Sequence, residues 1–125
     1  MIKLTKQQIL HLHAALIATS GGSTELRDEG LLESALAAPW QEFAGISQYP
    51  DVESKAARLG FGLICNHPFV DGNKRLGAHA MLIFLAVNGI QVNYTQDALI
   101  KVVLQVATDV LDCDGLRDWI LAHQQ

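Results

Sequence analysis

Apolar residues recur at three- and four-residue spacing along most of the chain, in runs bounded by capping residues and by glycine or proline. No segment alternates apolar and polar residues as a good strand does, and residues 90–94 are the only short extended candidate. The expected helices begin near Thr5, Asp28, Asp51, Asn73, Thr95 and Asp114. The pattern therefore predicts an all-α protein, a compact bundle of about six helices.

Length and charge narrow the class of protein. A chain of 125 residues, 50% of them apolar, can bury one core, so we expect one domain over residues 1–125. The chain has nine Lys and Arg but thirteen Asp and Glu, so its net charge is -4. This negative charge disfavours a dedicated nucleic-acid binder, which needs clustered cations. Four of the nine basic residues nevertheless fall within positions 55–75. A local anion site is therefore compatible with an acidic molecule.

The sequence also favours a cytoplasmic protein without a membrane segment. The longest apolar stretch, residues 76–87, is interrupted by His79 and is shorter than the roughly 18 residues of a spanning helix. The N-terminal residues do not show a charged segment followed by an apolar one, so we expect no signal peptide.

The segment from His67 to Arg75 joins two strongly helical stretches and is unusually polar for such a connection. Gly72 and Asn73 lead into a helix start, where unpaired N–H groups and the helix dipole bind anions. Lys74 and Arg75 add two cations that the dipole disfavours unless an anion lies between them and the helix. These four residues are our candidate phosphate-binding residues.

Two further side chains extend the candidate site. Asp71 supplies the hard oxygen that Mg²⁺ takes when it bridges to phosphates. His67, followed by Pro68, carries an imidazole suited to general-base chemistry near neutral pH. The alternative is an ordinary turn, since Asp-Gly-Asn is common turn chemistry. The combination within nine residues favours a phosphate site.

The sequence HPFVDGNKR from His67 to Arg75 resembles the signature of the Fic superfamily, H-P-F-x-[D/E]-G-N-[G/K]-R. The form with Lys74 resembles its Doc ("death on curing") branch, the toxin of a toxin–antitoxin pair. Residues 26–36 and 82–92 also look like Doc-type chains. The resemblance implies a Fic-like fold.

The resemblance also implies roles for the motif residues. His67 would be the catalytic base that deprotonates a target hydroxyl, and Asp71 would hold Mg²⁺. ATP phosphates would be bound by Gly72, Asn73, Lys74 and Arg75. Pro68 and Phe69 would position the motif loop.

Most Fic proteins transfer AMP from ATP to a protein hydroxyl, whereas Doc resembles a kinase acting on a threonine of elongation factor Tu. Lys74 replaces a glycine that lets backbone approach the phosphates, and Ala78 stands where many AMP-transferring relatives carry a second arginine. Both departures favour a Doc-type kinase that arrests translation. AMP transfer and a non-catalytic module that binds nucleotide or antitoxin remain as alternatives.

Self-inhibited Fic proteins carry a [S/T]-x-x-x-E-[G/N] helix. The nearest segment here ends at Glu29-Gly30, but Glu25 occupies the hydroxyl position. The resemblance therefore implies inhibition in trans by a separate, Phd-like antitoxin.

Residues 39–50 carry aromatic side chains without helical period and predict an ordered loop or a short hairpin. Their aromatic rings could simply cover the core. In Fic proteins a segment upstream of the motif is a flap that holds the target by main-chain hydrogen bonds. By that resemblance Phe43, Gly45 and Ile46 are candidate target-docking residues. His11 and His13, two residues apart on a helix, are expected at the surface.

Overall fold

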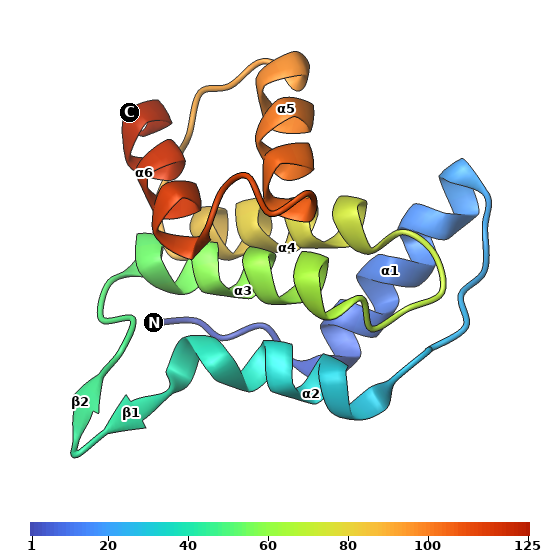
Figure 1. Ribbon diagram of the computed structural model, residues 1–125, viewed down its shortest axis with the longest axis horizontal. Helices are drawn as coiled ribbons and strands as arrows, with labels where there is room; N and C mark the ends of the chain where they lie inside the picture. The colour runs from blue at the N-terminus through green and yellow to red at the C-terminus, as the bar shows by residue number, and fades with distance from the viewer.

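The computed structural model describes residues 1–125 and contains six α-helices, which confirms the all-α prediction (Figure 1). The helices are α1 (Lys6–Ser20), α2 (Glu29–Ala37), α3 (Val52–Asn66), α4 (Asn73–Val87), α5 (Gln96–Ala107) and α6 (Cys113–His123). A short 3₁₀ turn, Ala38–Trp40, follows α2 and leads into the strands β1 (Glu42–Phe43) and β2 (Ile46–Ser47).

Helices α3 and α4 lie side by side at the centre, with the other helices around them (Figure 1). Their close approach depends on glycine. A Cβ at Gly77 of α4 would lie 2.5 Å from Cγ1 of Ile64 and 2.9 Å from the carbonyl oxygen of Gly60, both on α3. One cluster of 21 buried apolar residues fills the space between the helices. The α3–α4 pair thus positions the loop that joins the two helices, residues 67–72.

Side chains cap the N-termini of five of the six helices, and this explains where those helices begin. The capping residues are Thr5, Asp28, Asp51, Thr95 and Asp112. The sequence prediction named Asp114 for the last helix, which was wrong by two residues. The carboxylate of Asp112 accepts the Gly115 N–H at 2.8 Å, and Asp114 lies inside the first turn.

The segment before α3 is a small antiparallel hairpin, in which Glu42 pairs with Ser47 and Phe43 with Ile46. This confirms the short-hairpin prediction. Trp40 and Tyr49 are partly buried, whereas Phe43 is exposed. Extended backbone at residues 90–94 is limited to one bridge between Val92 and Gln124. None of the helices combines the length and the hydropathy needed to cross a bilayer.

Candidate active site

His67 ends α3 in a left-handed backbone conformation, with φ 53° and ψ 54°. This conformation is uncommon for a residue other than glycine, so the surroundings must hold it in place. The residue is exposed. The histidine rings that hydrogen-bond within the chain are those of His13 and His123, so the His67 imidazole remains available to a substrate.

Residues 25–28, which precede α2, hold the motif loop through its backbone. The N–H groups of Arg27 and Asp28 donate to the Pro68 carbonyl oxygen at 2.8 and 3.0 Å. The Val70 N–H in turn donates to the Glu25 carbonyl oxygen at 3.0 Å. The loop is therefore paired, through one isolated antiparallel bridge between Leu26 and Phe69, with a segment that the sequence prediction does not include.

The Arg27 side chain fixes the end of α3 beneath His67. Its Nε donates to the His67 carbonyl oxygen at 2.7 Å, and its Nη2 donates to the Asn66 carbonyl oxygen at 3.0 Å. A cation at these terminal carbonyls also matches the negative end of the helix dipole. Arg27 lay within the stretch that resembles Doc chains, but the sequence alone gave no reason to assign it to the site.

Asn73 closes the loop from the other side. Its buried amide donates from Nδ2 to the Phe69 carbonyl oxygen at 2.8 Å, and its Oδ1 accepts the Phe69 N–H at 2.9 Å. Phe69 itself is buried in the core, as expected of a residue that positions the loop. Because both polar atoms of the Asn73 side chain bond the Phe69 backbone, its own backbone N–H is the group that would contribute to the predicted phosphate cradle.

His13 is buried with 1% of its surface exposed, so the prediction that it lies at the surface was wrong. Its ring stacks on Phe69, with 3.6 Å between the ring centroids, and its Nε2 donates to the Asp71 carbonyl oxygen at 2.8 Å. The signal was present in the sequence, since Ile9, His13 and Ile17 recur every four residues on the buried face of α1. His11 is exposed, as expected.

Asp71 lies exposed beside the turn that follows α1. Its Oδ2 accepts the Ser23 N–H at 2.7 Å, which orients the carboxylate. A Cβ at Gly22, where φ is 110°, would come within 3.2 Å of this carboxylate. No group of three or more His, Cys, Asp or Glu side chains could hold a metal ion. Mg²⁺ is commonly bound through one or two carboxylates plus phosphates and water, and one oriented carboxylate fits that manner of binding.

The first turn of α4 differs from the other five helix starts because no side chain caps it. Gly72 precedes it with φ 81°, and a Cβ there would lie 3.0 Å from Cδ1 of Ile17. Lys74 and Arg75 are exposed on this turn, and the Arg75 guanidinium contacts the Ser20 hydroxyl. The N-terminus of α4 therefore combines unpaired backbone N–H groups with two cationic side chains, an arrangement that can bind an anion.

A groove of about 350 Å³ begins at Lys74 and Arg75 and continues between α4 and α5. Its floor is largely apolar, with Leu99, Ile100 and Val103 among the lining residues. His67 does not line this groove. There is thus open space beside the two cations.

The candidate docking residues Phe43, Gly45 and Ile46 do not lie next to His67. The hairpin leads into the N-terminus of α3, and His67 follows its C-terminus (Figure 1). A helix of 15 residues is about 22 Å long, so His67 lies roughly that far from the N-terminus of α3, into which the hairpin leads.

Comparison with known proteins adds independent information. The model of the Fic/DOC family matches residues 3–85. A protein named Toxin Doc, from Mycolicibacterium smegmatis, is 39% identical over 98 residues, which cover 77% of this chain and 75% of the relative. A protein named Protein kinase doc, from Escherichia phage P1, is 26% identical over 118 residues, which cover 94% of this chain and 92% of that protein.

Proposed function

The chain belongs to the Fic/DOC family, and on that premise we propose that it is a Doc-type toxin that phosphorylates a protein hydroxyl with ATP. The target we propose is a Ser or Thr of a translation protein, with elongation factor Tu as the first candidate. The observation that carries the proposal is the uncapped start of α4, where two cations stand at the end of a loop that begins with an exposed histidine. The name Protein kinase doc of one relative supports the reaction type.

We propose that the terminal phosphates of ATP bind at the start of α4. The backbone N–H groups of residues 73–75 and the side chains of Lys74 and Arg75 would provide the positive field. Asp71 is the residue that would hold Mg²⁺, which neutralises charge that develops on transferred phosphate. Occupation by phosphate would also compensate the unfavourable placement of two cations at a helix N-terminus.

His67 would act as the general base. Its imidazole would accept the proton of the target hydroxyl while the hydroxyl oxygen attacks the terminal phosphorus of ATP. The bond from that phosphorus to the bridging oxygen would break, and ADP would leave with its electron pair. Arg27 and the extended segment 25–28 hold the left-handed backbone of His67 and the loop that follows it, which fixes the point from which the ring projects. Transfer depends on this kind of fixed geometry.

Lys74 is the residue that distinguishes phosphate transfer from AMP transfer in this proposal. A lysine fills the space that glycine leaves open and adds a point charge, which favours a nucleotide pose with the terminal phosphate toward His67. The test is to incubate the protein and its target with ATP labelled at either the alpha or the gamma phosphate. Label from the gamma position is expected, and label from the alpha position would overturn the kinase assignment. Lys74→Gly should weaken gamma transfer.

We also propose that a Phd-like antitoxin inhibits the protein in trans, because the chain has no hydroxyl residue at position 25 to complete an inhibitory motif. Co-expression with the candidate antitoxin should restore growth to cells that express this chain. A His67→Ala control, which should be harmless alone, should accumulate to the same level with and without the antitoxin, and this separates inhibition from a loss of expression.

A further inference from the structure

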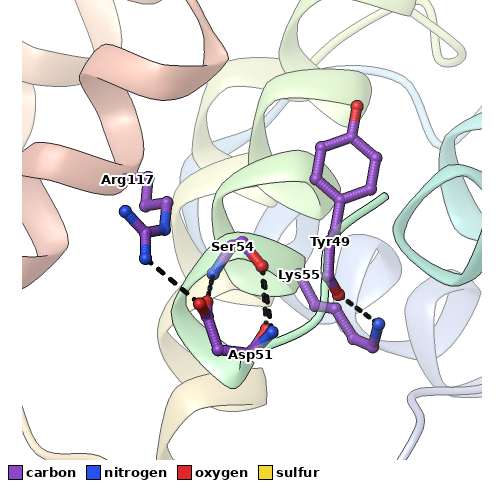
Figure 2. A network of polar contacts seen from close by, with 5 residues as sticks. All are labelled: Tyr49, Asp51, Ser54, Lys55 and Arg117. Carbon is purple, nitrogen blue, oxygen red and sulfur yellow. Dashed lines mark hydrogen bonds and ion pairs between the residues drawn. The ribbon is translucent and has the colours of Figure 1, made fainter. Parts of the chain in front are cut away.

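Four polar or charged side chains are buried in the molecule, and they act in pairs at opposite ends of α3. Ser54 and Lys55 bond the segment that leads into the N-terminus of α3 (Figure 2). His13 and Asn73 bond the motif loop that follows its C-terminus. The proposed reaction assigns a part to Asn73 but none to His13. The buried imidazole of His13 is therefore the polar group that still needs an explanation.

His13 lies on α1 with 1% of its surface exposed. Its ring stacks on Phe69, with 15° between the two ring planes. Its Nε2 lies 2.8 Å from the Asp71 carbonyl oxygen, and because a carbonyl oxygen can only accept, Nε2 carries the proton. An apolar side chain could pack in this place without the cost of removing an imidazole from water. The hydrogen bond to Asp71 is thus what this ring adds to packing.

This hydrogen bond holds the peptide group that joins Asp71 to Gly72. Gly72 has a left-handed φ of 81°, and a Cβ on it would lie only 3.5 Å from Nε2 of His13. A held peptide limits rotation about the backbone bonds on either side of it. It therefore sets the direction in which the Asp71 side chain leaves the backbone, immediately before the start of α4.

The turn that follows α1 holds the same region from its surface side. The Ser23 N–H donates to Oδ2 of Asp71 at 2.7 Å, and the Ser20 hydroxyl contacts the Arg75 guanidinium. Helix α1 and this turn thus contact both the proposed Mg²⁺ ligand and a proposed phosphate-binding side chain. Water can reach the contacts of the two serines, but His13 is buried, so water does not readily replace its hydrogen bond.

We propose that His13 is a positioning residue for the reaction, because from α1 it fixes the backbone of Asp71 so that the carboxylate is presented to Mg²⁺. This inference rests on the proposed function, in which Asp71 holds Mg²⁺ beside the phosphates of ATP. His13 is buried, so it acts through Asp71 and not on the reacting groups. Residues that orient a metal ligand contribute strongly to metal affinity.

Two substitutions separate the hydrogen bond from the packing of the ring. The amide nitrogen of glutamine is as many bonds from the backbone as Nε2 of histidine, so His13→Gln keeps a donor that can reach the Asp71 carbonyl oxygen. Asparagine is one bond shorter, so the amide of His13→Asn falls short of that oxygen. Both variants lose the stack on Phe69. A role in packing alone predicts that both are impaired, whereas our proposal predicts that His13→Gln resembles the wild type.

The first test needs no nucleotide. The Ser23 amide proton reports on the Asp71 carboxylate because it donates to Oδ2, and Asp71→Ala gives its chemical shift when that bond is lost. In His13→Asn the Ser23 amide shift should move toward the value of Asp71→Ala, and in His13→Gln it should stay near the wild-type value. A wild-type Ser23 shift in a folded His13→Asn variant would overturn the proposal.

The second test measures the binding of ADP by calorimetry, with and without Mg²⁺. His13→Asn should raise the Kd of ADP at least about tenfold in the presence of Mg²⁺. Without Mg²⁺ the Kd should change by less than about twofold, since the uncapped start of α4 and its two cations remain. His13→Gln should stay within about twofold of the wild type in both conditions. An equal loss of affinity with and without Mg²⁺ in His13→Asn would contradict the proposal.

Controls keep the result interpretable. His11→Asn makes the same change at an exposed histidine of the same helix and should behave as the wild type. If His13→Asn fails to fold, a folded His13→Gln variant that loses Mg²⁺-dependent ADP binding would reject the proposal. If the wild type does not bind ADP in either condition, the proposed nucleotide chemistry is wrong, and the Ser23 shift still decides whether His13 positions Asp71.

Discussion

The motif loop and the hairpin lie at opposite ends of α3 and are held in different ways. The loop from His67 to Asn73 receives hydrogen bonds from α1, from residues 23–28 and from the start of α4, and its Phe69 is buried. The hairpin is fixed at its base by Lys55, while its tip is exposed. The motif loop is constrained along its whole length, whereas the hairpin is constrained only at its base.

This difference matches the two tasks that we propose. A reacting group must be held within a fraction of an ångström of its working position, so the loop needs support from several elements. A docking surface must stay accessible, so its apolar side chains cannot be buried, and only its orientation can be fixed. Substitutions in the loop should therefore lower kcat, and substitutions in the hairpin should raise KM for the protein target.

The largest effect is expected from His67→Ala. Without the general base, the rate of phosphate transfer should fall by about 10²–10⁴-fold, while the circular dichroism spectrum stays unchanged. His11→Ala is the matched control, because His11 is equally a surface histidine but lies on α1. A comparable loss in both variants, or transfer retained in His67→Ala, would contradict the assignment of the base.

Asn73→Ala should affect stability and rate together. It removes two buried hydrogen bonds and leaves the Phe69 N–H and carbonyl unpaired, which should cost about 2–4 kcal/mol in the free energy of unfolding by urea. The rate should also fall, because the loop loses its closure. Asn93→Ala, at an exposed position, should change neither. A stable Asn73→Ala variant with normal transfer would show that the loop is not constrained in this way.

The double change Phe43→Ser with Ile46→Ser should have the reverse profile. Because both side chains are exposed, the free energy of unfolding should stay within about 0.5 kcal/mol of the wild type. KM for the protein target should rise about tenfold, with kcat preserved. Val110→Ser, an exposed apolar residue elsewhere, is the control. An unchanged KM for the protein target would show that the hairpin does not take part in target binding.

The smallest predicted effect concerns the base of the hairpin and pH. Burial opposes ionisation of Asp51, but the hydrogen bonds from Ser54 and Arg117 outweigh it and hold the pKa of this carboxyl below its usual value. Its contribution to stability is therefore present above an aspartate's ordinary pKa, about 3.9, and is lost as pH falls through the lowered value.

Asp51→Asn should accordingly be less stable than the wild type by up to ~1 kcal/mol at pH 7, since the pair with Arg117 is partly exposed. Urea unfolding at several pH values should show this gap closing below about pH 3.9. A gap that stays constant down to pH 2 would mean that the ionised carboxylate is not the stabilising group.

Local patterns in the sequence predicted much of the fold. Capping residues such as Thr5 and Asp51 act on groups three positions away, so the starts of helices can be read from neighbouring residues. The sequence also located the motif loop, because His67 to Arg75 are consecutive.

The supporting contacts could not be predicted in this way. Arg27 meets the end of α3 forty residues later in the chain, and Ser23 meets Asp71 across forty-eight. Lys55 looked like part of a basic cluster and is in fact buried under the hairpin. Only the packing of the helices brings these distant residues together, and the spacing of neighbouring residues in the sequence does not predict such contacts. His13 is the exception: the surface prediction for it was wrong, although its four-residue spacing from Ile9 and Ile17 is a sequence signal that could have identified it as buried.

The central claim, transfer of phosphate from ATP to a protein hydroxyl by His67, is tested most directly by the intact mass of elongation factor Tu after incubation with this protein, ATP and Mg²⁺. We expect a gain of about 80 Da with the wild type and none with His67→Ala. A gain of about 329 Da would show AMP transfer instead, and the same gain of about 80 Da with both proteins would show that His67 is not the base.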